Sequence, residues 1–171
     1  MKEFIDILNL INNGKIEEAE ILLRESKEEN GKYWYLTGLI AFFKGNEDVA
    51  LHFLLKSLKD ESIRKGLKIN IKRTAAYILL SKKEYEKTIK LIEGIENKNV
   101  DDFFILFTAN LFMNNYNKAR EYLTKAYEKD RKKTRDLLLK LYQTYIKPSP
   151  EIDNEAKALF LKLIERLEVN S

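Results

Sequence analysis

The chain has 171 residues, a net charge of +4, and a composition that is 44% hydrophobic and 34% charged, with six glycines and two prolines. This composition excludes a disordered or low-complexity chain, and the scarcity of glycine and proline favours long helices with short connections over a sheet with many tight turns. The absence of cysteine excludes disulfide bonds and thiolate metal sites.

The start of the chain, Met1 to Asp6, contains acidic side chains and no apolar run, so we expect no secretory signal. The longest uncharged stretch, residues 103–117, is shorter than the ~20 apolar residues that span a membrane. We therefore expect a cytoplasmic protein without a membrane segment. The charge is unevenly distributed: residues 1–31 contain four basic and eight acidic side chains, whereas residues 62–100 contain ten basic and four acidic ones.

The first two predicted helix hairpins, about residues 1–30 and 31–61, share one pattern of small residues. Gly14 and Gly45 fall where a first helix must stop, because glycine accepts the left-handed conformation common there. Ala19 and Ala50 each follow five residues later and would let the two helices of a hairpin approach closely. The second hairpin has the fullest pattern: Trp34, Gly38, Gly45, Ala50, Leu54 and Ser57. We expect Trp34, Gly38 and Ala50 to be buried.

The same spacing of small residues continues through three further predicted hairpins, about residues 62–98, 100–130 and 131–168. The small-residue positions are Ala19, Ala50, Thr88, Ala119 and Ala156. The 38 residues between Ala50 and Thr88 predict that the first helix of the third hairpin is about one turn longer. The Ser149-Pro150-Glu151 sequence predicts that the last helix starts there.

This order of aromatic, small and large apolar residues resembles the tetratricopeptide repeat, whose period is ~34 residues. The resemblance implies an all-α fold: a right-handed α-solenoid of about five antiparallel helix hairpins, forming a single repeat domain over residues 1–171. It also implies a non-enzymatic scaffold or adaptor for protein–protein interaction.

Residues suited to catalysis are missing from the sequence. His52 is the only histidine, so neither a histidine metal site nor a catalytic triad can form around it. The six glycines form no phosphate-binding pattern. Asp101 and Asp102 precede an apolar run and are interpreted as helix-capping residues. We expect no enzymatic activity, no catalytic residues, no metal and no cofactor.

In the resembled family the first helices of successive hairpins line an inner groove. Carried over to this chain, the groove is expected to present an aromatic surface to a bound peptide or helix. Phe42 and the inner position Phe4 would also contribute to it. The predicted groove residues are Tyr35, Leu39, Phe43, Tyr77, Phe104, Thr108 and Phe112.

Residues 103–107 are five consecutive apolar residues, which predicts a helix that is buried on all sides. Something must then cover the groove beside this helix: a peptide partner, a second copy of the chain, or the last helix, about residues 152–169. The last helix would present an apolar stripe made of Ala156, Leu159, Phe160, Leu163 and Leu167.

Two basic clusters predict a second surface: Arg64, Lys65, Lys68 and Lys72 in one helix, and Arg131, Lys132, Lys133 and Arg135 in a later one. Clustered lysine and arginine bind phosphates without sequence preference, so the alternative function is an RNA-binding helical repeat. Aromatic residues for base stacking do not alternate with these charges, which favours a protein partner of acidic character over nucleic acid. A homodimer is a further alternative.

Overall fold

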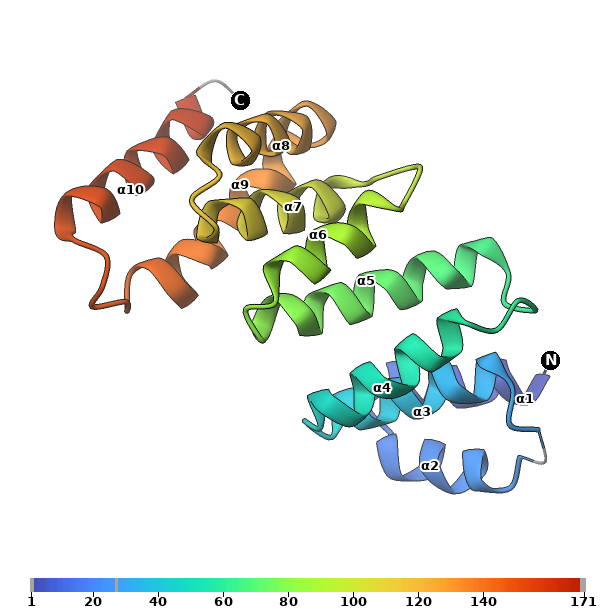
Figure 1. Cartoon of the computed structure of the whole chain (residues 1–171). Coiled ribbons are helices and arrows are strands. Elements are labelled where there is room, and N and C mark those ends of the chain that lie inside the picture. Colours follow the sequence, from blue (N-terminus) through green and yellow to red (C-terminus); the bar gives the residue numbers. More distant parts are fainter. Residues whose placement is uncertain (1, 27, 170–171) are drawn as a thin grey trace. The chain divides into compact units, whose positions relative to one another are not determined.

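A computed structural model describes residues 2–26 and 28–169. The regular secondary structure of this part of the chain is entirely helical, with ten α-helices, one π-helical turn and no strand (Figure 1). The helices group into two compact units, Met1–Ile95 and Glu96–Ser171. The first unit contains α1 (Lys2–Asn12), α2 (Ile16–Arg24), α3 (Gly31–Phe43), α4 (Glu47–Leu58), α5 (Lys65–Ser81) and α6 (Tyr85–Glu93). The second contains α7 (Val100–Phe112), α8 (Tyr116–Lys129), α9 (Arg131–Leu141), the π-helical turn η1 (Tyr142–Ile146) and α10 (Asn154–Val169).

The turn inside each of the first four hairpins has the same backbone conformation. One residue is left-handed in every case: Gly14 (φ 75°), Gly45 (φ 77°), Lys83 (φ 60°) and Asn114 (φ 59°). The next amide always donates to a carbonyl five residues earlier, as Lys15 does to Leu10 at 2.9 Å and Asn115 to Asn110 at 2.8 Å. This is the bonding of a Schellman motif, which closes the end of a helix. The repeat predicted from small residues is therefore present in the backbone.

Lys83 occupies this left-handed position without being glycine, and its replacement by glycine should stabilise the protein. A left-handed residue with a Cβ costs roughly 1–2 kcal/mol, so Lys83→Gly should raise the free energy of unfolding by about 1 kcal/mol. Asn114→Gly should gain less, because asparagine tolerates this conformation. The control is Lys59→Gly at the right-handed end of α4 (φ −77°), which should be destabilising. Urea unfolding followed by circular dichroism measures all three variants.

The predicted small residues sit where helices touch. A Cβ added at Gly38 in α3 would lie 2.9 Å from Leu54 Cγ and 3.2 Å from the Ala50 carbonyl oxygen in α4. Ala50 and Leu54 are themselves fully buried. Ala19, Thr88 and Ala119 occupy the same phase and are buried as well, which confirms the helical-repeat fold for four hairpins. The fifth copy departs from it, because Ala156 is exposed.

The start of α3 is joined to the end of α4 around Gly31. The Gly31 amide donates to Asp60 Oδ2 at 2.5 Å, and Ser57 Oγ donates to the Gly31 carbonyl at 2.6 Å. Hydrogen bonds from Ser62 and Gly31 hold the pKa of the Asp60 carboxyl below its ordinary value. A Cβ at Gly31 would lie 2.6 Å from Ile63 Cγ1 and 2.7 Å from Asp60 Cβ, so no larger residue fits without displacement.

The first helix of the third hairpin has the predicted extra length. The α5 helix contains 17 residues against 13 in α3, a difference of about one helical turn. The turn is added at the N-terminal end, because the left-handed turn that follows α5 keeps its place relative to Thr88. The 38-residue interval is thus explained.

In the second unit, α9 packs against α7, and α10 packs on α9 and η1. Leu138 of α9 is fully buried in one cluster with Phe104 and Phe107 of α7. Of the covers considered for this face of α7, α9 packs against it within the described residues, and α10 joins the same cluster through Ile164. Leu159 of α10 is 60% exposed and Ala156 is exposed, while Phe160 stacks on Tyr142 with 6.1 Å between ring centroids. The side chain of Leu167 lies outside the described residues.

The last helix also begins later than predicted. It starts at Asn154, where the Asp153 carboxylate accepts the Ala156 amide at 2.7 Å, and Pro150 lies outside it. The sequence predicted a cap at Ser149, but residues 149–153 are not helical. The cap is Asp153, whose carboxylate accepts this hydrogen bond as a serine hydroxyl would. Within the part of the chain that the structure describes, no helix combines the length and the apolar character needed to cross a membrane.

Candidate functional site

Five aromatic side chains of the first unit form what we call the aromatic strip: Phe4 of α1, Tyr35, Phe42 and Phe43 of α3, and Tyr77 of α5. The Phe4 and Tyr35 ring centroids are 6.4 Å apart, and the Phe42 and Tyr77 centroids are 6.1 Å apart with the rings edge to face. These two contacts connect α3 with α1 and with α5. Each of the three helices is the first helix of its hairpin.

The helical period explains why these side chains share a face. Tyr35, Leu39 and Phe42 are spaced four and three residues apart, which places them along one side of α3. Phe4 contacts this side from α1, and Tyr77 contacts it from α5. The first helices of three successive hairpins therefore meet along one line of side chains.

Burial differs sharply along the strip. Tyr35 and Leu39 are 6% and 7% exposed and belong to the buried core of the first unit, and Phe4 of α1 lies against Tyr35. Phe43 and Tyr77 are 54% and 53% exposed, although their aromatic rings are large and apolar. Phe42 is half-buried between them. The accessible end of the aromatic strip is thus the pair Phe43 and Tyr77, with Phe42 as its floor.

Burial raises the pKa of the Tyr35 hydroxyl above its ordinary value, because the charged form is disfavoured there. The folded chain then holds this proton at a pH where the unfolded chain has lost it, so stability should fall as the pH rises past about 10. Tyr35→Phe should reduce this alkaline loss. Urea unfolding of both proteins at about pH 8 and about pH 11 tests the effect. An equal alkaline loss in the two proteins would show that Tyr35 is not its source.

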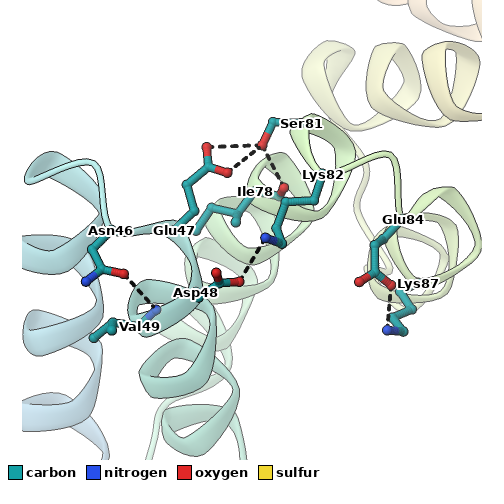
Figure 2. A network of polar contacts seen from close by, with 9 residues as sticks. All are labelled: Asn46, Glu47, Asp48, Val49, Ile78, Ser81, Lys82, Glu84 and Lys87. Carbon is teal, nitrogen blue, oxygen red and sulfur yellow. Dashed lines mark hydrogen bonds and ion pairs between the residues drawn. The ribbon is translucent and has the colours of Figure 1, made fainter.

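A polar network connects the start of α4 with the end of α5 (Figure 2). Ser81, one helical turn after Tyr77, is 3.1 and 3.2 Å from the two carboxylate oxygens of Glu47 in α4. Lys82 Nζ lies 2.8 Å from Asp48 Oδ1, and this hydrogen bond raises the pKa of the lysine. The network links the second and third hairpins, a few residues along the chain from Phe43 and Tyr77.

The other predicted groove residues lie in the second unit. Phe104 and Thr108 are buried, and the Thr108 hydroxyl donates to the Phe104 carbonyl at 2.9 Å. Phe112 is 37% exposed at the end of α7. The expectation that this helix is buried on every side is therefore wrong at its C-terminal end. Asp102 accepts the Asn99 amide in a capping box, as the capping interpretation of the sequence predicted.

The two basic clusters are only partly available to a polyanion. Arg64 and Lys65 are exposed, but Lys68 and Lys72 are half-buried, and Lys72 Nζ donates to the Gly94 carbonyl at 2.9 Å. In α9, Arg131 and Lys132 are exposed and Arg135 is half-buried. Arg131 lies over the Tyr127 ring at 4.7 Å, and Lys133 pairs with Asp101 at 2.6 Å.

Trp34 is half-buried, so its predicted burial is wrong. Its ring stacks on Phe53 of α4 with centroids 5.5 Å apart, and Lys56 Nζ lies 3.3 Å from the indole centroid. The indole is large enough to reach from α3 to the edge of α4, where the lysine covers its outer face. Among the described residues, no group of three or more histidine, aspartate or glutamate side chains could hold a metal ion.

No family model matches the sequence, and no curated protein matches it significantly. The structure is similar to the MamA 41-end structure from Desulfovibrio magneticus RS-1, with a TM-score of 0.71, 18% sequence identity, and coverage of 99% of this chain and 96% of that chain. It is also similar to the MamA RS-1 ArsTM double mutant, with a TM-score of 0.70, 18% identity, and coverage of 99% and 94%. These likenesses show a tetratricopeptide-like helical repeat fold.

Proposed function

We propose that the chain is a non-enzymatic protein-interaction scaffold that binds a peptide or helix of its partner at the accessible end of the aromatic strip. The observation that carries the proposal is the exposure of Phe43 and Tyr77, each more than half open to water beside a half-buried Phe42. Phe42 contacts both exposed rings, Phe43 in its own helix and Tyr77 in α5, and such clusters of exposed aromatic side chains are typical of interaction surfaces.

The surface favours a partner segment with apolar or aromatic side chains. Covering one aromatic side chain contributes roughly 1.5–3 kcal/mol, so Phe43 and Tyr77 together could supply much of the affinity of a short peptide. Two features hold the strip in place: the buried side chains of Tyr35 and Leu39 fix α3, and the exposed Glu47–Ser81 hydrogen bond links α4 to the end of α5. A preformed surface of this kind loses little entropy on binding.

A peptide library provides the test. Peptides selected on the wild-type protein should lose about tenfold or more in affinity on Phe43→Ala/Tyr77→Ala, because two hot-spot rings are removed. The matched control is Tyr116→Ala/Tyr145→Ala, which removes two rings of similar exposure from the second unit. Equal affinity of the selected peptides for wild type and Phe43→Ala/Tyr77→Ala would reject the proposed site. Circular dichroism of both variants should match the wild type, since the changed side chains are exposed.

The RNA-binding alternative has weaker support, because Lys72 and Lys133 are engaged within the protein. It predicts binding of a generic RNA with a steep loss of affinity as salt rises. We expect no such binding at low salt.

A further inference from the structure

The α10 helix has one packed face and one exposed face. On the packed face, Ile164 is 5% exposed and Phe160 stacks on the first residue of η1. On the exposed face, Leu159 is 60% exposed, Ala156 is exposed and Leu163 is half-buried. These last three residues are three and four positions apart, so they form one line along the helix. We call this line the α10 stripe.

Charged side chains border the α10 stripe in a definite order. Glu155 lies at its N-terminal end, and Lys162 lies seven residues later, which is two helical turns along the same edge. Both side chains are exposed, and among the residues that the structure describes neither has an ion-pair partner. The edge is therefore acidic at its start and basic at its end.

The other charges of α10 do not change this order. Lys157 is half-buried, and its Nζ donates to the Ser149 carbonyl at 2.7 Å. Glu165 is exposed, but it lies about 120° or more around the helix from each residue of the α10 stripe. The side chain of Arg166 lies outside the described residues. The sequence places Arg166 four residues after Lys162, with the same sign of charge.

Such a face is complementary to itself when two helices run antiparallel. Glu155 of each copy then lies against Lys162 of the other, so that two ion pairs form across the contact. The same alignment places Leu159 of each copy beside Ala156 of the other, a large side chain against a small one. A parallel pair would instead bring like charges to the same level of the two helices.

We propose that this face of α10 is a self-association surface, on which a second copy of the chain docks its own α10 in antiparallel orientation. The contact is isologous, because both copies contribute the same residues. One helix pair buries less than the ~1,000 Å² of a stable interface, so the dimer is weak, with a Kd on the order of 1 mM. Phe43 and Tyr77 take no part, and the proposal does not rest on the function proposed above.

Cross-linking tests the pairing of Glu155 with Lys162. A carbodiimide joins a carboxylate to an amine only when the two groups touch, and it leaves no spacer between them. The full chain, half of it labelled with ¹⁵N and half unlabelled, is treated at about 1 mM. Mass spectrometry should find Glu155–Lys162 cross-links that join a labelled peptide to an unlabelled one. Absence of cross-links of mixed label would overturn the proposal.

Reversing the charges tests the antiparallel orientation. Glu155→Lys and Lys162→Glu should each weaken the dimer by about fivefold, because each change replaces two attractive pairs by two repulsive ones. The double variant Glu155→Lys/Lys162→Glu restores both pairs and should return to within about twofold of the wild type. The concentration dependence of the α10 amide shifts, from about 0.05 to 2 mM, gives the Kd by nuclear magnetic resonance. A double variant weaker than either single variant would contradict the pairing.

Two further variants locate the contact. Leu159→Ala should weaken the dimer by about tenfold, with circular dichroism showing an unchanged fold, because it removes the largest exposed side chain of the α10 stripe. Phe43→Ala/Tyr77→Ala should dimerise as the wild type does. Loss of the dimer in this second variant would show that the copies meet at the aromatic strip and would overturn the assignment to α10.

Discussion

Replacing Gly31 with alanine should lower the free energy of unfolding by about 1–3 kcal/mol, the usual cost of overpacking a tight site. The added Cβ would lie 2.6 Å from Ile63 Cγ1 and 2.7 Å from Asp60 Cβ, closer than carbon atoms approach one another. Relief requires the start of α3 to move away from the end of α4. That movement would stretch the bonds that Gly31 makes with Asp60 and Ser57.

Gly66→Ala is the matched control, because Gly66 is exposed in the first turn of α5 and its Cβ would meet nothing within 4 Å. Alanine there should stabilise the protein by about 0.4–1 kcal/mol, since it reduces the freedom of the unfolded chain. Urea unfolding gives both values. A neutral Gly31→Ala variant would show that the junction between α3 and α4 is loose.

Replacing Leu138 with alanine should have the larger effect, a loss of about 2–5 kcal/mol. Leu138 is fully buried in the cluster of α7, α9, η1 and α10, where its removal leaves a cavity. The result tests the assignment of α9 as the helix that covers α7.

The control for this variant is Leu159→Ala in α10, at a side chain that is 60% exposed. It should change the stability by less than about 0.5 kcal/mol. If Leu159→Ala were the more damaging of the two, the last helix would be the cover that its apolar stripe suggested. Unfolding should be followed by circular dichroism, because the single tryptophan, Trp34, lies in the first unit.

The helical repeat could be predicted from the sequence because its causes are local and steric. Gly38 and Ala50 are small where α3 and α4 touch, and Gly45 is left-handed where α3 ends. The equivalent turns at Lys83 and Asn114 could not be identified by residue type, since neither is glycine. Only their positions, five residues before Thr88 and Ala119, indicate them.

The candidate site could be predicted only in part, because helical spacing identifies a face and not what covers it. The spacing predicts one groove for Tyr35 and Tyr77, yet Tyr35 is buried in the core of the first unit and Tyr77 is 53% exposed. In the second unit, α9 begins with basic residues from Arg131, which favoured its interpretation as a charged surface helix. Its later part is apolar, and Leu138 there is buried.

Intermolecular nuclear Overhauser effects between the protein and a peptide selected on it test most directly whether the aromatic strip is the interaction surface. We expect effects between the peptide and the ring protons of Phe43 and Tyr77, and their loss in Phe43→Ala/Tyr77→Ala. Effects confined to Tyr116 or Tyr145, or to the exposed Ile21 of α2, would place the peptide elsewhere and contradict the proposed function.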